Sequence, residues 1–109
     1  MKLFIIDWTK ELTTPLIEYC KKNATVVGTE LSDGAEAYRK TGLLKPDAIV
    51  INYSSKPSYG RLAADSIRKR NGSTLTPIYF IDGAEDENEK AENIGICLSS
   101  EELEDLLAE

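Results

Sequence analysis

Five short apolar runs alternate along the chain with five segments in which apolar residues recur at helical spacing. The runs predict strands at residues 3–6, 25–28, 48–51, 78–81 and 94–98. Most of them are continuously apolar, which is typical of strands covered on both faces in a parallel sheet. The intervening segments predict helices at residues 11–23, 34–41, 60–70, 85–92 and 101–108.

Strands that alternate with helices predict βαβ units with right-handed crossovers. With 109 residues, the chain has the size of one domain, so we expect a single α/β domain over residues 1–109. Its expected core is a doubly wound, parallel five-stranded sheet in the flavodoxin-like order 2-1-3-4-5. Ser99 and Glu102 have the spacing of a capping box for the last helix. Pro15 suits a first helical turn after Thr13 or Thr14, which leaves the start of the first helix open.

Polar residues follow several of the predicted strands. The carboxyl ends of parallel strands meet at one edge of the sheet, and ligands bind outside that edge in folds of this type. We therefore expect a candidate site there, formed by Asp7, Trp8, Asn52, Asp82, Gly83, Ser99 and Ser100.

The stretch from Asp47 to Asn52 predicts a buried strand that ends in Asn52, and Gly60 follows eight residues later at the start of a helix. In this respect the chain resembles the receiver domain of bacterial response regulators. In that family the strand ends in an aspartate that accepts a phosphoryl group, and a glycine lies eight positions on. The resemblance covers the whole chain as a βα pattern, and the strand that ends in Asp7 supports it. It implies a receiver fold without an output domain.

The resemblance also implies a set of site residues, from which the chain departs. Receivers hold Mg²⁺ with two acidic residues after strand one and with the acceptor aspartate. A hydroxyl residue after strand four and a lysine after strand five bind the phosphoryl oxygens, and a proline often follows. Here Asp7 matches one acid, but Trp8 replaces the second acid, Asn52 the acceptor, Asp82 the hydroxyl residue, Ser99 the lysine and Ser100 the proline.

These departures remove the chemistry of phosphoryl transfer. An amide nitrogen is not a nucleophile for a phosphoryl donor, and a neutral group holds a divalent cation poorly. Ser99 supplies no positive charge, and Asp82 would repel a phosphate. Asp7 and Asp82 are only weak metal candidates, because strand three lies between their strands. We therefore expect a degenerate pseudo-receiver, not an enzyme, with a vestigial pocket and without phosphorylation, bound metal or cofactor.

Simpler structural roles are predicted for several of these residues. Asp7 is expected to accept hydrogen bonds from a nearby loop or helix start, and Asp82 with Gly83 to form a turn. Cys20 and Cys97 lack metal-site spacing and are expected to be small buried residues. The chain has no histidine, which excludes Ser-His and Cys-His nucleophile pairs.

Other residues near this edge have more than one interpretation. The aromatic residues Trp8, Tyr53 and Tyr59 either cover the vacated pocket or anchor a partner. Lys56 is a candidate counter-ion for Asp7 or Asp82. Gly60 followed by Arg61 is a weak signal for an anion site at a helix start.

Charge and composition limit the classes of partner that the protein could bind. A net charge of −6 argues against binding to nucleic acid or to an anionic membrane. No apolar run approaches the roughly 20 residues of a membrane span, and the first run is too short for a signal peptide. We therefore expect a cytoplasmic protein.

Three functions remain open from the sequence. The first is a stand-alone pseudo-receiver that binds a protein partner in bacterial two-component signalling, or forms a homodimer, through helix four, strand five and helix five. The second is a small-ligand or enzymatic domain that uses Asp7, Asn52 and Asp82 in a strand-edge crevice. The third is a receiver remnant that binds only a divalent cation. For the first, a partner with a basic surface would meet Asp86, Glu89, Glu101, Glu104 and Asp105.

Overall fold

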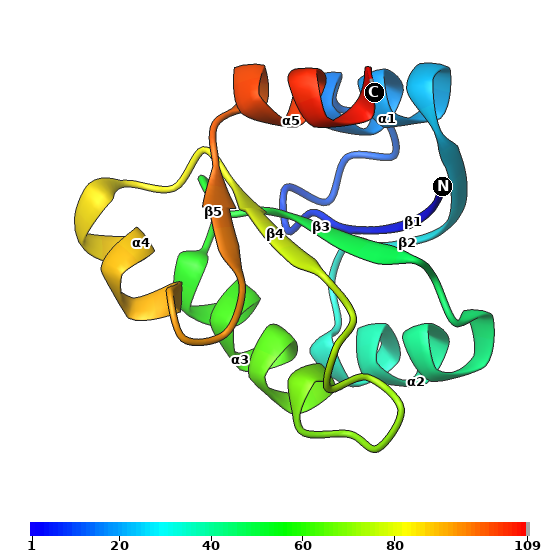
Figure 1. Cartoon of the computed structure of the whole chain (residues 1–109), viewed down its shortest axis with the longest axis vertical. Coiled ribbons are helices and arrows are strands. Elements are labelled where there is room, and N and C mark those ends of the chain that lie inside the picture. Colours follow the sequence, from blue (N-terminus) through cyan, green and yellow to red (C-terminus); the bar gives the residue numbers. More distant parts are fainter. Residues whose placement is uncertain (109) are drawn as a thin grey trace.

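The computed structural model, which describes residues 1–108, contains one parallel sheet flanked by helices (Figure 1). The strand order is β2-β1-β3-β4-β5, as predicted. Every neighbouring pair of strands is parallel; β3 lies at the centre, and β1 pairs with both β2 and β3. The strands are β1 (Lys2–Ile6), β2 (Thr25–Glu30), β3 (Ala48–Asn52), β4 (Ile78–Ile81) and β5 (Ile96–Leu98).

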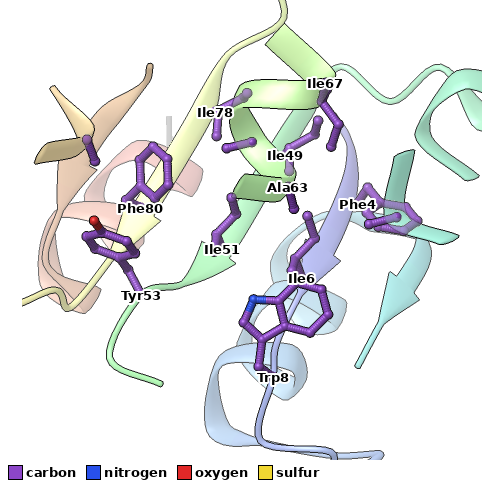
Figure 2. Close-up of a cluster of buried hydrophobic side chains, with 13 residues drawn as sticks. Phe4, Ile6, Trp8, Ile49, Ile51, Tyr53, Ala63, Ile67, Ile78 and Phe80 are labelled. Carbon is purple, nitrogen blue, oxygen red and sulfur yellow. The ribbon is translucent and has the colours of Figure 1, made fainter. Parts of the chain in front are cut away.

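Helices cover both faces of this sheet (Figure 1). The helices are α1 (Pro15–Asn23), α2 (Gly34–Leu44), α3 (Pro57–Arg68), α4 (Glu85–Ala91) and α5 (Ser100–Leu107). On one face, Ile17 and Cys20 of α1 and Leu103 of α5 pack against Leu3, Ile5 and Val50. On the other, α2, α3 and α4 pack against the larger cluster that includes Phe4, Ile49 and Phe80 (Figure 2). Burial on both faces explains why the strands are apolar at consecutive positions.

Several predicted boundaries were wrong by a few residues. The first helix begins at Pro15 rather than at residue 11, because the Thr14 side chain caps it by accepting a hydrogen bond from the Ile17 N–H. The third helix begins at Pro57 rather than at Gly60, because the fixed φ angle of proline suits the first helical position. Gly60 therefore lies within the first turn of α3 and not at its start.

The last strand begins at Ile96, two residues later than predicted. Gly95, just before it, passes very close to β4: a Cβ atom at Gly95 would lie 2.4 Å from the Ile78 carbonyl oxygen and 2.9 Å from the Phe80 ring. Only glycine allows the chain to enter β5 at this distance. Within residues 1–108, no helix is long and apolar enough to cross a membrane.

Candidate functional site

The Asp7 side chain is fully buried where β1 ends. Its Oδ1 accepts hydrogen bonds from the Thr9 backbone N–H and from the Asn52 Nδ2, both at 3.2 Å. Its Oδ2 accepts a hydrogen bond from the Thr14 hydroxyl at 2.9 Å. Thr14 in turn caps α1, so the carboxylate ties the end of β1 to the start of that helix.

Asn52 links the ends of β1 and β3. Its Nδ2 donates to Asp7, while its Oδ1 accepts from the Ser54 backbone N–H at 3.2 Å and from the Ser54 hydroxyl at 2.6 Å. Both ends of the amide therefore have partners. An aspartate at this position could accept the bonds from Ser54, but it could not donate to Asp7. The amide thus supplies a donor to a buried carboxylate, which is costly to leave unpaired.

Asp82 makes hydrogen bonds with the start of α5. Its backbone is left-handed, with φ 58°, and its Oδ1 accepts from the Ser100 N–H at 2.7 Å. Its Oδ2 accepts from the Ser100 hydroxyl. Asp7 and Asp82 share no hydrogen-bond partner in the described chain, and residues 1–108 contain no cluster of three acidic or cysteine side chains placed to hold a metal.

Ser99 is the N-cap of α5, as its spacing to Glu102 predicted. The Ser99 hydroxyl accepts a hydrogen bond from the Glu102 N–H, and the Glu102 carboxylate accepts one from the Ser99 N–H. The serine at the position of the receiver lysine therefore begins a helix.

Tyr53 and Arg61 form a partly buried polar contact with α4. The Tyr53 hydroxyl donates to the Glu87 carbonyl oxygen at 2.7 Å. Arg61 donates to the Tyr53 hydroxyl at 2.8 Å and pairs with the Glu87 carboxylate. Burial raises the pKa of Tyr53, and the nearby guanidinium opposes that shift only in part. Arg61 is thus engaged within the protein, which corrects its interpretation as an arm of an anion site.

The three aromatic residues near this edge differ in exposure. Trp8 is 4% exposed and Tyr53 is 1% exposed, whereas Tyr59 is 56% exposed. In Figure 2, Trp8 and Tyr53 lie among the core side chains. Lys56 lies 5.8 Å from the Tyr59 ring centroid, and no ion pair joins it to Asp7 or Asp82 within residues 1–108. Two of the aromatics are therefore part of the core, and the third faces solvent.

The two cysteines also differ. Cys20 is buried, as predicted, and burial raises its pKa to about 11, so it is a thiol at neutral pH. Cys97 is only partly buried, which corrects the prediction for it, and its thiol lies 3.6 Å from the Asn88 carbonyl oxygen.

Glu30, at the end of β2, is a buried acid that the sequence analysis did not single out. It is 7% exposed, pairs with Lys40 at 2.7 Å and accepts hydrogen bonds from the Ser32 and Asp33 N–H groups. Burial alone would raise its pKa, but these partners outweigh it and the pKa is lowered. An acid two residues before the helix-capping sequence Ser32-Asp33 was the available signal.

Glu30→Gln is expected to lower the free energy of unfolding by about 1 kcal/mol at pH 7, because the variant loses a charged acceptor. A lowered pKa means that the wild-type advantage is present above the unfolded pKa of about 4.3 and is lost as the pH falls through the folded value. Urea unfolding between pH 7 and pH 3 should show the difference vanish at the acidic end. Glu36→Gln, at an exposed pair with Arg39, should change nothing measurable. A constant difference across this range would contradict the role given to the Glu30 charge.

Neither a protein-family model nor a curated protein matches the chain.

Proposed function

We propose that the protein is a pseudo-receiver: a cytoplasmic protein-interaction module of bacterial signal transduction that works without phosphorylation and without catalysis. The observation that carries this proposal is the hydrogen bond from the Asn52 amide to Asp7. The acceptor position of a receiver holds a group that is no nucleophile, and its N–H satisfies the one carboxylate that matches the cation site. The strand order and the Asn52 to Gly60 spacing support the likeness to receivers.

An output that depends on binding needs a surface, and the edge near β5 carries exposed acidic residues on the two helices beside it. α4 and α5 lie on opposite faces of the sheet, with β5 at the edge between them (Figure 1). Ile96 of β5 is 52% exposed. Together with the acidic residues on both helices, it suits a partner with a basic rim and an apolar centre. We name these exposed residues the acidic strips: Asp86 and Glu89 on α4, and Glu101, Glu104 and Asp105 on α5.

The double variant Glu101→Lys/Glu104→Lys is expected to weaken partner binding by about tenfold or more, because it places like charges against a basic surface. The measurement is a calorimetric titration with the purified partner that immobilised wild-type protein recovers from the native cell. Glu11→Lys/Glu18→Lys changes the net charge equally at exposed positions outside the strips and should bind as wild type does.

Asp7→Asn is the second arm of this experiment, because it changes the vestigial pocket and leaves the strips intact. It should bind the partner within about twofold of wild type. If Asp7→Asn abolishes binding while the lysine variant binds normally, the working site is the old pocket and the proposal is wrong.

A further inference from the structure

A cleft of about 570 Å³ lies between α2 and α3. It shares Trp8 with the expected vestigial pocket, but neither Asp7 nor Asp82 lines it, nor does any residue of the acidic strips. β1 is an interior strand of the sheet, but its own helix, α1, packs on the face opposite the cleft. The side of β1 that faces the cleft is therefore covered only by the helices that follow its two neighbours, β2 and β3. Trp8 lies at the bottom of this gap, just beyond the end of β1. In doubly wound folds, this change of crossover direction beside the first strand is where crevices form.

Aromatic residues and small residues line the cleft. Three of the chain's eight aromatic residues lie here: Trp8, Tyr38 and Tyr59. Gly34 and Ala63 bring the two helices close, since a Cβ atom at Gly34 would lie 3.8 Å from the Ala63 Cβ. Small residues between aromatic walls leave a slot in which a flat ring can contact protein on both sides.

No lining residue carries a charge, although 29% of the whole chain is charged. An ion that entered this cleft would lose hydration without meeting an opposite charge among the lining residues, whereas an uncharged ring would gain from burial. The cations beside the cleft, Lys56 and Arg70, already lie against the Tyr59 and Tyr38 rings, 5.8 Å and 4.6 Å from the ring centroids. The cleft offers polar contact through the Ser66 hydroxyl and the Tyr59 hydroxyl, which have no hydrogen bond within the described part of the chain. The Trp8 ring nitrogen points toward Ile51 and Tyr53 in the core (Figure 2). Trp8 therefore offers the cleft the apolar surface of its ring and no hydrogen-bond donor.

We propose that the α2–α3 cleft binds a small, uncharged aromatic molecule of one to three rings. Its volume is within the range of about 300–1,000 Å³ typical of small-molecule sites. Leu62, which is 67% exposed, forms the outer rim and would cover such a ligand. The site differs from the strand-edge crevice of Asp7, Asn52 and Asp82, because none of these three residues lines it.

Trp8 is the only tryptophan of the chain and lines this cleft, so its fluorescence responds to a ligand that binds there. The probe is N-phenyl-1-naphthylamine, an uncharged aromatic amine that accepts energy from tryptophan. We expect saturable binding with a dissociation constant on the order of 100 µM or tighter, seen as energy transfer from Trp8. The matched probe 8-anilinonaphthalene-1-sulfonate adds one negative charge to the same rings and should bind about tenfold more weakly.

Two variants locate the binding. Ala35→Phe fills the cleft from an exposed position, and Leu62→Lys places a charge on its rim; each should weaken N-phenyl-1-naphthylamine about tenfold. Leu75→Lys, at a residue that is 92% exposed outside the cleft, should leave the affinity unchanged. Circular dichroism checks that each variant is folded.

Three outcomes would overturn the proposal. The first is no saturable binding to the wild type, and the second is binding that Ala35→Phe leaves intact. The third is equal affinity for the sulfonated probe. If the cleft takes no probe but Leu62→Lys abolishes binding of a protein partner, the cleft is a protein-docking site and the proposed ligand class is wrong.

Discussion

Asn52→Asp is expected to lower the free energy of unfolding by about 2 kcal/mol at pH 7 in the absence of divalent cations. In the variant, a carboxylate oxygen replaces the amide nitrogen that donates to Asp7 across 3.2 Å. It lies beside the carboxylate of Asp7, which is fully buried. A hydrogen bond is thereby replaced by the repulsion of two like charges. Urea unfolding in EDTA measures the loss.

The same two neighbouring carboxylates make the stability of this variant depend on pH and on metal ions. One of two adjacent carboxylates keeps its proton to a higher pH than it does in the unfolded chain. The folded variant then binds more protons than the unfolded one, so its deficit should shrink as the pH falls from 7 toward 5. Millimolar Mg²⁺ should also reduce the deficit, because two carboxylates can share a cation.

Asn52→Leu is the charge-free control: it removes the hydrogen bond to Asp7, and those from Ser54 as well, without adding charge. It should be destabilised without any response to Mg²⁺ and without the pH dependence of Asn52→Asp. With acetyl phosphate and Mg²⁺, intact-mass spectra of the wild type and of Asn52→Asp should show no added phosphoryl group, because Ser99 supplies no positive charge. Wild-type stability of Asn52→Asp in EDTA, or rapid phosphorylation of it, would contradict this account of the site.

Gly95→Ala is expected to lower the free energy of unfolding by about 3 kcal/mol. The new methyl group would lie 2.4 Å from the Ile78 carbonyl oxygen, which is backbone of β4 and not a flexible side chain. Relief requires β4 to shift, yet Ile78 is paired with Ile49 of β3. Thermal unfolding by circular dichroism gives the measurement.

Gly34→Ala is the control for this substitution. Its methyl group meets only the Ala63 Cβ at 3.8 Å, an ordinary contact, so stability should stay within about 0.5 kcal/mol of wild type. Equal effects at both glycines would show that helix and strand propensities, rather than the close approach to β4, explain the loss at Gly95.

The sequence predicted the fold because its evidence repeats along the chain. Each β-strand is an apolar run, each helix follows one, and the order of a five-unit βα chain is strongly constrained. The first residues of the helices were harder to predict, because a proline is common both in loops and at the first position of a helix. α1 begins at Pro15, which could be chosen only once Thr14 was known to cap the helix. α3 begins at Pro57, whereas the prediction had placed its start at Gly60.

The site was predictable in its location but not in its contacts. The strand ends placed Asp7 and Asn52 at one edge, but the sequence does not tell which side chain donates to which. The same limit applies to Arg61, whose partner Glu87 lies 26 residues away. The cleft between α2 and α3 was missed for another reason, since the gap depends on how far apart two helices lie. Tyr59, Leu62 and Ser66 do share a helical stripe beside the buried stripe of α3, which was a usable signal.

The Asn52 to Asp7 contact also bears on how such a protein would be controlled. A phosphoryl group or a bound cation can be removed within seconds, whereas an amide encoded in the chain stays for the life of the molecule. If the protein is a pseudo-receiver, we expect this contact to favour one conformation from the moment the chain folds. Its influence on a partner would then follow the number of copies in the cell, and gene expression and proteolysis would take the place of kinase and phosphatase.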